Sequence, residues 1–162
     1  MILAITDVAY KDDVARAACV LADGWTAKRP LRTFSALRTP VAEYVPGEFW
    51  QRELPVLLAL LEGVKADVVV VDGYVWLDDA GRKGLGARLY DAMGVPVVGV
   101  AKTAFDGSGF ARQVLRGESR KPLYVTSVGV DVDEAAEAVR TMHGSHRIPA
   151  LLTAADRLAR YG

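Results

Sequence analysis

The feature that most constrains this chain is the order in which its apolar runs follow one another. Residues 2–10 and 14–22 both have the pattern of strands, and only the short polar turn at 11–13 separates them. A second turn at 23–24 leads to a third run at 31–37. The first part of the chain therefore predicts an antiparallel meander.

The second part of the chain alternates strands with helices. A helix is predicted from 49 to 61. Two short apolar runs, at 68–71 and 95–100, enclose a helical stretch at 85–93, which is typical of a parallel strand–helix–strand unit. The remaining predicted elements are a helix around 110–115, a strand at 123–128, a helix from 133 to 142 and a short helix near 151–160. We therefore expect an α/β fold, a mixed sheet flanked by helices, in a single domain spanning residues 1–162.

Composition and charge narrow the classes of function. The 20 basic residues balance the 20 acidic ones, so any attraction for phosphate must be local. The apolar runs are too short to cross a bilayer, and we expect a soluble, cytoplasmic, monomeric protein with no membrane partner. Cys19 is the only cysteine, and its apolar neighbours favour a buried, inert thiol over a catalytic one.

Three acidic residues occupy positions where a negative charge needs a partner. Asp7 has apolar neighbours in the first strand, where an ionised carboxylate is costly unless it is paired. Asp72 ends a buried strand just before Gly73, at the edge where open α/β sheets place ligands. Glu53 can point toward the same edge from the preceding helix. Three hard oxygen ligands suit Mg²⁺ or Mn²⁺, whereas one cysteine and two histidines do not suit zinc.

Each acid also has a structural explanation when it is taken alone. Asp72 before Gly73 is typical of a turn, and Asp7 can be a core acid paired with an arginine. Glu53 can be a solvated helical residue. The spacing of the three acids does not by itself establish that they converge.

Ordered segments along nearly the whole chain resemble the motifs of the endonuclease V family. They are I5-T-D-V-A-Y10, Y44-V-P-G-E-F-W-Q-R-E53, V70-V-D-G73, V98-G-V-A-K102, K121-P-L-Y-V-T-S-V-G129 and H146-R-I-P-A-L-L-T-A-A-D-R-L158. The resemblance implies a ribonuclease H-like fold. It also implies a metal-dependent endonuclease that hydrolyses the phosphodiester bond 3′ to a deaminated purine, chiefly inosine, in the repair of DNA.

The resemblance implies roles for five charged residues. Asp7, Glu53 and Asp72 match the acids that bind the metal, Mg²⁺ with Mn²⁺ as a substitute. Lys102 matches a lysine that stabilises charge near the scissile phosphate, and its alternative is a surface lysine at a strand exit. Asp156 falls where the family has a polar or acidic residue that could reach the metal, and its alternative is a solvated helical residue.

The resemblance further implies a pocket for a base that leaves the duplex. Tyr44, with Pro46 and Gly47, matches a loop that wedges into the strand beside the lesion, although a packed loop tyrosine is the alternative. The backbone amides expected to read the edge of hypoxanthine belong to the loops at Gly47, Gly73, Gly84 and Leu85.

The sequence departs from the family pattern beside these acids. Family members usually carry a histidine directly after the Asp-Gly pair and another a few residues on. Here Tyr74 takes the first position and Asp78 or Asp79 the second. A carboxylate at the second position can bind metal or act as a base, but it cannot donate a proton while it is ionised. The chain therefore resembles a short, divergent branch.

Two other functions stay open from the sequence. One is a catalytically idle homologue that binds nucleic acid without cutting it, and the other is a nuclease of the same fold that acts on inosine-containing RNA or branched DNA. Two basic clusters could follow a nucleic-acid backbone, with solvated loop charges as the alternative. The clusters are Lys28, Arg29, Arg32 and Arg38, and then Arg112, Arg116, Arg120 and Lys121.

Overall fold

The computed structural model describes residues 1–39, 43, 46, 50–105 and 108–162 of the chain. Its strands are β1 (Ile2–Lys11), β2 (Val14–Asp23), β3 (Arg32–Arg38), β4 (Val68–Asp72), β5 (Val97–Ala101), β6 (Arg112–Val114) and β7 (Leu123–Val128). Its helices are α1 (Trp50–Leu61), α2 (Leu85–Met93), α3 (Val132–Thr141) and α4 (Ala150–Tyr161), with a 3₁₀ turn, η1, at Ser108–Phe110. Within those residues, no helix is long and apolar enough to span a membrane.

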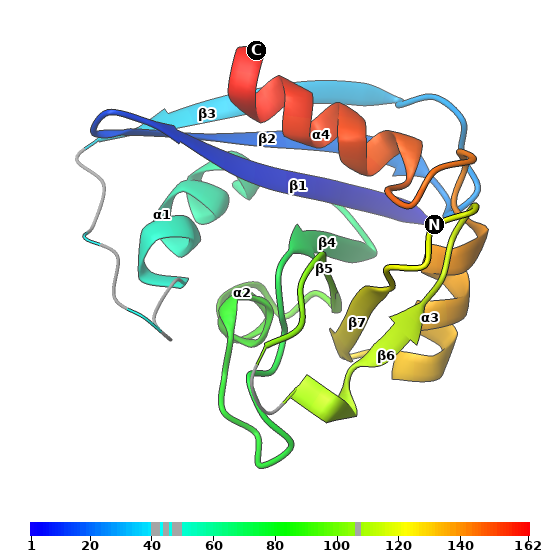
Figure 1. Ribbon diagram of the computed structural model, residues 1–162. Coiled ribbons are helices and arrows are strands. Elements are labelled where there is room, and N and C mark those ends of the chain that lie inside the picture. The colour runs from blue at the N-terminus through cyan, green and yellow to red at the C-terminus, as the bar shows by residue number, and fades with distance from the viewer. Residues whose placement is uncertain (40–42, 44–45, 47–49, 106–107) are drawn as a thin grey trace.

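All seven strands form one mixed sheet in the order β3-β2-β1-β4-β5-β7-β6 (Figure 1). β1, β2 and β3 pair antiparallel, which confirms the predicted meander. β4 pairs parallel to β1 and to β5, which confirms the predicted strand–helix–strand unit with α2 as its crossover. β7 then returns antiparallel to β5, and β6 pairs with β7 at the edge. The predicted α/β fold with a mixed sheet flanked by helices is confirmed.

The helix predicted around 110–115 is wrong. The chain instead makes the single turn η1 and then the short strand β6. β6 pairs antiparallel with β7, so that β7 does not form the edge of the sheet, and Val114 is buried in the core. A run this short satisfies either a helical or an extended pattern, and the unpaired edge of β7 favours the extended form.

Helices cover both faces of the sheet, α1 and α2 one face and α3 and α4 the other. Because side chains alternate along a strand, Leu3 and Ile5 point into the core under α3 and α4, while Ala4 points into the core under α1 and α2. Asp7 continues the first series on β1, and Asp72 continues the matching series on β4. Both acids therefore emerge on the α4 side of the sheet.

Cys19 lies in the core of the meander. It is fully buried and forms no disulfide. Burial raises the pKa of the Cys19 thiol to about 12, so the side chain is a protonated apolar group at neutral pH. This agrees with the predicted inert thiol.

Candidate active site

β1 and β4 bring two acids to the same level of the sheet. The parallel ladder between these strands ends at the pair Ile5–Val70, and Asp7 and Asp72 each lie two residues beyond it. The sheet no longer holds the two backbones together at that point, so the acids stand where β1 and β4 cease to pair. This is the carboxyl edge of the parallel strands, where the sequence placed them.

The environment of Asp7 disfavours its negative charge. Asp7 is 9% exposed, and the backbone N–H of Val8 donates to its Oδ1 at 2.8 Å. Burial, followed by the charge of Asp72, raises the pKa of Asp7 to about 7, against the opposing effects of the Val8 hydrogen bond and of Lys102. Near neutral pH this carboxyl is therefore balanced between its two protonation states.

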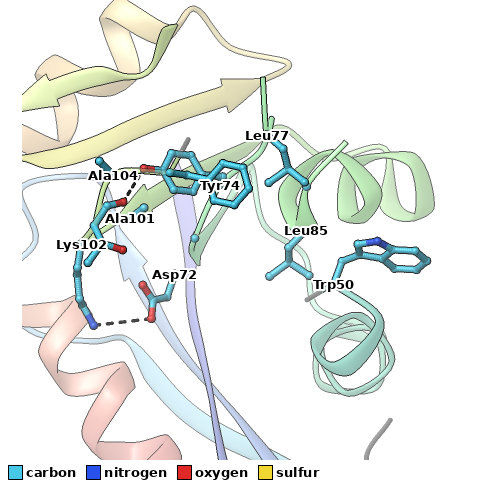
Figure 2. A pocket seen from close by; sticks show the side chains of 12 residues that line it. Trp50, Asp72, Tyr74, Leu77, Leu85, Ala101, Lys102 and Ala104 are labelled. Carbon is cyan, nitrogen blue, oxygen red and sulfur yellow. Dashed lines mark hydrogen bonds and ion pairs between the residues drawn. The ribbon is translucent and has the colours of Figure 1, made fainter. Parts of the chain in front are cut away.

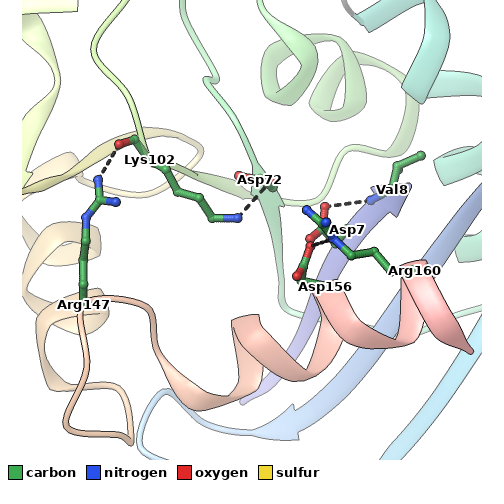
Figure 3. A network of polar contacts seen from close by, with 7 residues as sticks. All are labelled: Asp7, Val8, Asp72, Lys102, Arg147, Asp156 and Arg160. Atoms are coloured by element: carbon green, nitrogen blue, oxygen red, sulfur yellow. Dashed lines mark hydrogen bonds and ion pairs between the residues drawn. The ribbon is translucent and has the colours of Figure 1, made fainter. Parts of the chain in front are cut away.

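Lys102 supplies the nearest positive charge to Asp72. It follows the last residue of β5, and its Nζ lies 3.7 Å from Asp72 Oδ2 (Figure 3). Burial raises the pKa of Asp72, and the ammonium of Lys102 is the largest influence that lowers it. Both side chains are about 40% exposed, so the pair is open to solvent and to a substrate.

Glu53 approaches the same acids from α1, on the other face of the sheet. It lies in the first turn of α1 and is 5% exposed. Burial, then the charges of Asp72 and Asp7, raises the pKa of Glu53 well above its usual value. Its neighbour Tyr10 carries the guanidinium of Arg52 over its ring, 4.2 Å from the centroid. Asp72 thus disfavours the charge of Asp7, and both disfavour the charge of Glu53, which brings together three acids from three elements.

α4 contributes a fourth acid, Asp156, which lies beside Asp7 (Figure 3). Its Oδ1 accepts a hydrogen bond from Arg160 Nε at 2.9 Å, one helical turn further on. The negative charge of Asp156 raises the pKa of both Asp7 and Asp72. Asp156 therefore faces the other acids and is not only a solvated helical residue.

The chemistry of these four carboxylates suits a hard divalent cation. The nearby cations Lys102 and Arg52 do not offset the burial of the acids, because the pKa values of Asp7, Glu53 and Asp72 are all raised. A further positive charge among them would restore their ionised forms. Among the described residues, no three potential ligands form a ready-made metal cage. The fit to Mg²⁺ or Mn²⁺ therefore rests on the charge and the oxygen donors of the cluster, not on ligand distances.

A pocket of about 380 Å³ opens beside Asp72 and Lys102 (Figure 2). Three residues predicted to bind substrate, Gly73, Gly84 and Leu85, line it together. A Cβ atom at position 84 would lie 2.6 Å from the backbone oxygen of residue 74, so only glycine allows this close approach at the start of α2. The structure therefore gathers these residues at one pocket beside the acids.

The walls of this pocket are aromatic, which the sequence did not predict. The Tyr74 ring lies 6.0 Å from the Phe105 ring at an interplanar angle of 50°, and the Tyr74 hydroxyl donates to the Thr103 carbonyl at 2.6 Å. Trp50, at the start of α1, has the Arg88 guanidinium 3.9 Å from its ring centroid. All three aromatic residues line the pocket. The only sign of them in the sequence was their position, Trp50 within a motif segment and Tyr74 and Phe105 just after two others.

The loop predicted to wedge beside a lesion lies mostly outside the described residues. Tyr44 and Gly47 lie outside the described residues. Pro46 is described, as an exposed turn residue.

Asp78 and Asp79, the two candidates for the position of the second family histidine, follow Leu77, which lines the pocket. The Asp78 carboxylate accepts hydrogen bonds from the backbone N–H groups of Ala80 at 3.0 Å and Arg82 at 2.9 Å. Asp79 is exposed. Neither residue lines the pocket beside Asp72. Asp78 therefore shapes the loop before α2.

Arg116 fits neither of the two explanations offered for its basic cluster. It is 5% exposed, and its guanidinium donates to the carbonyls of Met142 at 2.6 Å, His146 at 2.9 Å and Gly144 at 3.0 Å. Burial lowers the pKa of this guanidinium. Arg116 therefore holds the connection between α3 and α4 and is neither a solvated loop charge nor free to follow a nucleic-acid backbone.

Known proteins share both the sequence and the architecture of this chain. A family model described as Endonuclease V matches residues 1–114. Endonuclease V of Ignicoccus hospitalis is 33% identical over 95% of this chain and 79% of its own length. The crystal structure of endonuclease V from Streptomyces avermitilis superimposes with a TM-score of 0.78 and 30% identity, covering 99% of this chain and 80% of that one.

The structure of a third similar protein was solved in complex with nucleic acid. Endonuclease V of Ciona intestinalis, in complex with a 24mer DNA containing an inosine followed by a ribo-adenosine, superimposes with a TM-score of 0.83. The match covers 98% of this chain and 84% of that one at 19% identity, a likeness of fold alone. The architecture is that of the endonuclease V structures, which are ribonuclease H-like, and this confirms the predicted fold.

Proposed function

The chain belongs to the endonuclease V family, whose members are nucleases, and from this premise we propose that it cuts DNA 3′ to a deaminated purine, inosine, in nucleic-acid repair. The observation that carries the proposal is the gathering of Asp7, Glu53 and Asp72 beside a pocket of about 380 Å³. We further propose that a monomer formed by the single domain 1–162 is the active unit.

We propose that Asp7, Glu53 and Asp72 hold Mg²⁺, or Mn²⁺ in its place, with Asp156 as a further ligand. The bound ion would supply Lewis acidity at the phosphate and a nucleophile from water at neutral pH. The pKa of Asp7, raised to about 7, supports this, since near neutral pH this carboxyl partly carries a proton that a cation displaces. Binding of the ion near pH 7 is therefore expected to release protons into solution.

Lys102 is proposed to face the scissile phosphate. Its ammonium lies 3.7 Å from Asp72, at the edge that the acids share with the pocket. From there a compact positive charge can stabilise the charge that develops on the phosphate as the bond breaks. Because Asp72 holds the ammonium in place before substrate arrives, little reorganisation is needed during the reaction.

The pocket is proposed to receive the inosine base after it leaves the stack. Its volume accommodates a purine, and its backbone lining at Gly73, Gly84 and Leu85 can read the edge of the base. The aromatic walls offer stacking to its faces. Tyr44, with Pro46 and Gly47, is proposed to fill the gap that the base leaves in the strand, on the family resemblance alone.

The test uses labelled DNA and RNA oligonucleotides, each with or without one inosine, incubated with the protein and Mg²⁺ or Mn²⁺. We expect cleavage of the inosine DNA on the 3′ side of the inosine, its loss in chelator, and its loss in Asp7→Asn. Asp91→Asn is the matched control, because Asp91 pairs with Lys83 on the surface at 2.6 Å.

Each other result identifies a different function. Tight binding without product identifies an idle homologue, and preferential cleavage of RNA identifies a ribonuclease of the same fold. Cleavage that ignores inosine leaves a nuclease without the repair specificity. Full activity of Asp7→Asn would overturn the metal-site assignment.

A further inference from the structure

Hydrogen bonds from two side chains, Arg147 and Tyr74, fix the backbone at and after Lys102, just beyond the end of β5. The ladder of β5 ends at the pair Val100–Asp72 on one side and Ala101–Tyr124 on the other. The next two carbonyls, those of residues 102 and 103, accept hydrogen bonds from the Arg147 guanidinium and the Tyr74 hydroxyl respectively. A strand exit that would otherwise be free to fray is fixed on both sides of the lysine.

The contact of Tyr74 with the Thr103 carbonyl lies close to the Asp72–Lys102 ion pair, because Tyr74 and Asp72 are near one another in the chain. It follows Asp72 by two residues, so one segment presents both the carboxylate and the phenol. The carboxylate meets the Lys102 ammonium at 3.7 Å, and the phenol donates to the Thr103 carbonyl at 2.6 Å (Figure 2). The exits of β4 and β5 are thus joined twice, once through the lysine side chain and once through the backbone next to it.

We propose that Tyr74 is a positioning residue that sets where the Lys102 ammonium stands relative to the acids. The proposal rests on the proposed function, in which Lys102 faces the scissile phosphate. Tyr74 reaches no reacting group itself, since its hydroxyl is occupied by the Thr103 backbone. It acts by fixing the base of a long, flexible side chain whose tip must be in place before the reaction.

The ring and the hydroxyl of Tyr74 have separable effects. The ring packs near Phe105 and forms part of the pocket wall, whereas the hydroxyl holds the backbone. Tyr74→Phe removes the hydroxyl and keeps the wall. Phe105→Leu alters the wall and keeps the hydroxyl. The first variant should therefore change the rate of the bound complex, and the second should change the binding of substrate.

The first measurement is single-turnover cleavage of inosine DNA under saturating protein. Tyr74→Phe is expected to lower the rate about three- to tenfold, the value of one hydrogen bond. The protein concentration that gives half of the maximal single-turnover rate should be nearly unchanged. Tyr161→Phe is the matched control, because this tyrosine at the end of α4 is 82% exposed, and it should cleave at the wild-type rate.

The decisive arm combines Tyr74→Phe with Lys102→Ala. If Tyr74 acts through Lys102, removing its hydroxyl has no further effect once the lysine is gone, and the double variant cleaves as slowly as Lys102→Ala alone. A general structural loss would instead lower the rate by the same factor in both backgrounds. That additive result, or a wild-type rate for Tyr74→Phe, overturns the proposal.

Amide hydrogen exchange tests the same claim without cleavage. Exchange at residues 102–105 should be faster in Tyr74→Phe than in the wild type, while the central strands keep their protection. Unchanged exchange at 102–105 overturns the proposal. If the wild-type protein does not cut inosine DNA, the proposed function has failed, and the exchange measurement still decides whether Tyr74 fixes this segment.

Discussion

The raised pKa of Asp7 predicts that the metal-free protein loses stability as the pH rises. In the unfolded chain this carboxyl ionises near pH 3.8, and in the folded protein near pH 7. Between those values the folded state binds a proton that the unfolded state has released. The stabilising contribution is therefore fully present below about pH 3.8 and lost by the time the pH passes 7. Most carboxyls have the opposite effect, because their pKa falls on folding.

The size of the effect follows from the two pKa values. At about 1.4 kcal/mol for each pH unit between 3.8 and about 7, the full loss is about 4 kcal/mol, and about 2–3 kcal/mol of it falls between pH 5 and 8. Asp7→Asn cannot ionise, so its unfolding free energy should lack this fall. The raised pKa values of Glu53 and Asp72 act in the same direction and leave a smaller fall in the variant.

The assay is urea denaturation followed by circular dichroism at pH 5 and pH 8, with chelator present. Wild type should lose at least about 2 kcal/mol more than Asp7→Asn over this range. Adding Mg²⁺ at about 100 times its dissociation constant should return about 3 kcal/mol to the wild type at pH 8, and much less to the variant. Asp91→Asn, which breaks an exposed ion pair, should behave as the wild type at both pH values.

Two results would refute this reasoning. One is a wild-type stability that rises from pH 5 to pH 8 in chelator, which would mean that Asp7 is ionised at little cost. The other is an equal fall in wild type and Asp7→Asn, which would place the titrating group elsewhere.

Two further predictions concern the scaffold around the site; both are measured by urea denaturation, and the second also by the kinetics of cleavage of inosine DNA. Arg116→Ala should lower the unfolding free energy by about 3 kcal/mol, because the buried Met142 carbonyl and the part-buried carbonyls of Gly144 and His146 lose their donor. Arg120→Ala, in the same basic cluster but exposed, should change it by less than about 0.5 kcal/mol. Equal stability of the two variants would contradict the structural role of Arg116. Gly99→Ala should cost about 1–3 kcal/mol and raise KM, since its Cβ would lie 2.5 Å from the Gly73 oxygen. Gly109→Ala meets nothing within 4 Å and should leave both quantities unchanged.

The sequence predicted the helices and strands wherever the hydrophobic pattern was long enough to distinguish a helical period from a strand alternation. The helix expected at 85–93 and the strand expected at 123–128 have those bounds in the structure. The run at 110–115 failed because three paired residues are too few to show an alternation, and because the pairing depends on a partner strand that comes later in the chain. Such a strand is specified by the edge of β7, not by its own residues.

Individual residues of the candidate site could be predicted only where the strand pattern of the sequence determines the position of an acidic side chain. Asp7 and Asp72 follow from the alternation and the parallel register of two strands. The contact of Asp156 with this cluster required the packing of α4, and the aromatic wall of Tyr74 and Phe105 required the path of the loop after β5. The role of Arg116 was not predicted, because the sequence does not show which arginine is buried and donates to backbone carbonyls.

The arrangement of charge argues against a module that only binds nucleic acid. Such a module needs positive groups along a phosphate backbone, and burying acids in its contact surface would repel the ligand. Here Asp7, Glu53 and Asp72 lie beside the pocket, and their raised pKa values show that ionising them there costs free energy. A cation held among them, as we propose, would offset that cost and would turn a repulsive edge into one that accepts phosphate. The energetics of the metal-free site thus favour an enzyme over an idle homologue.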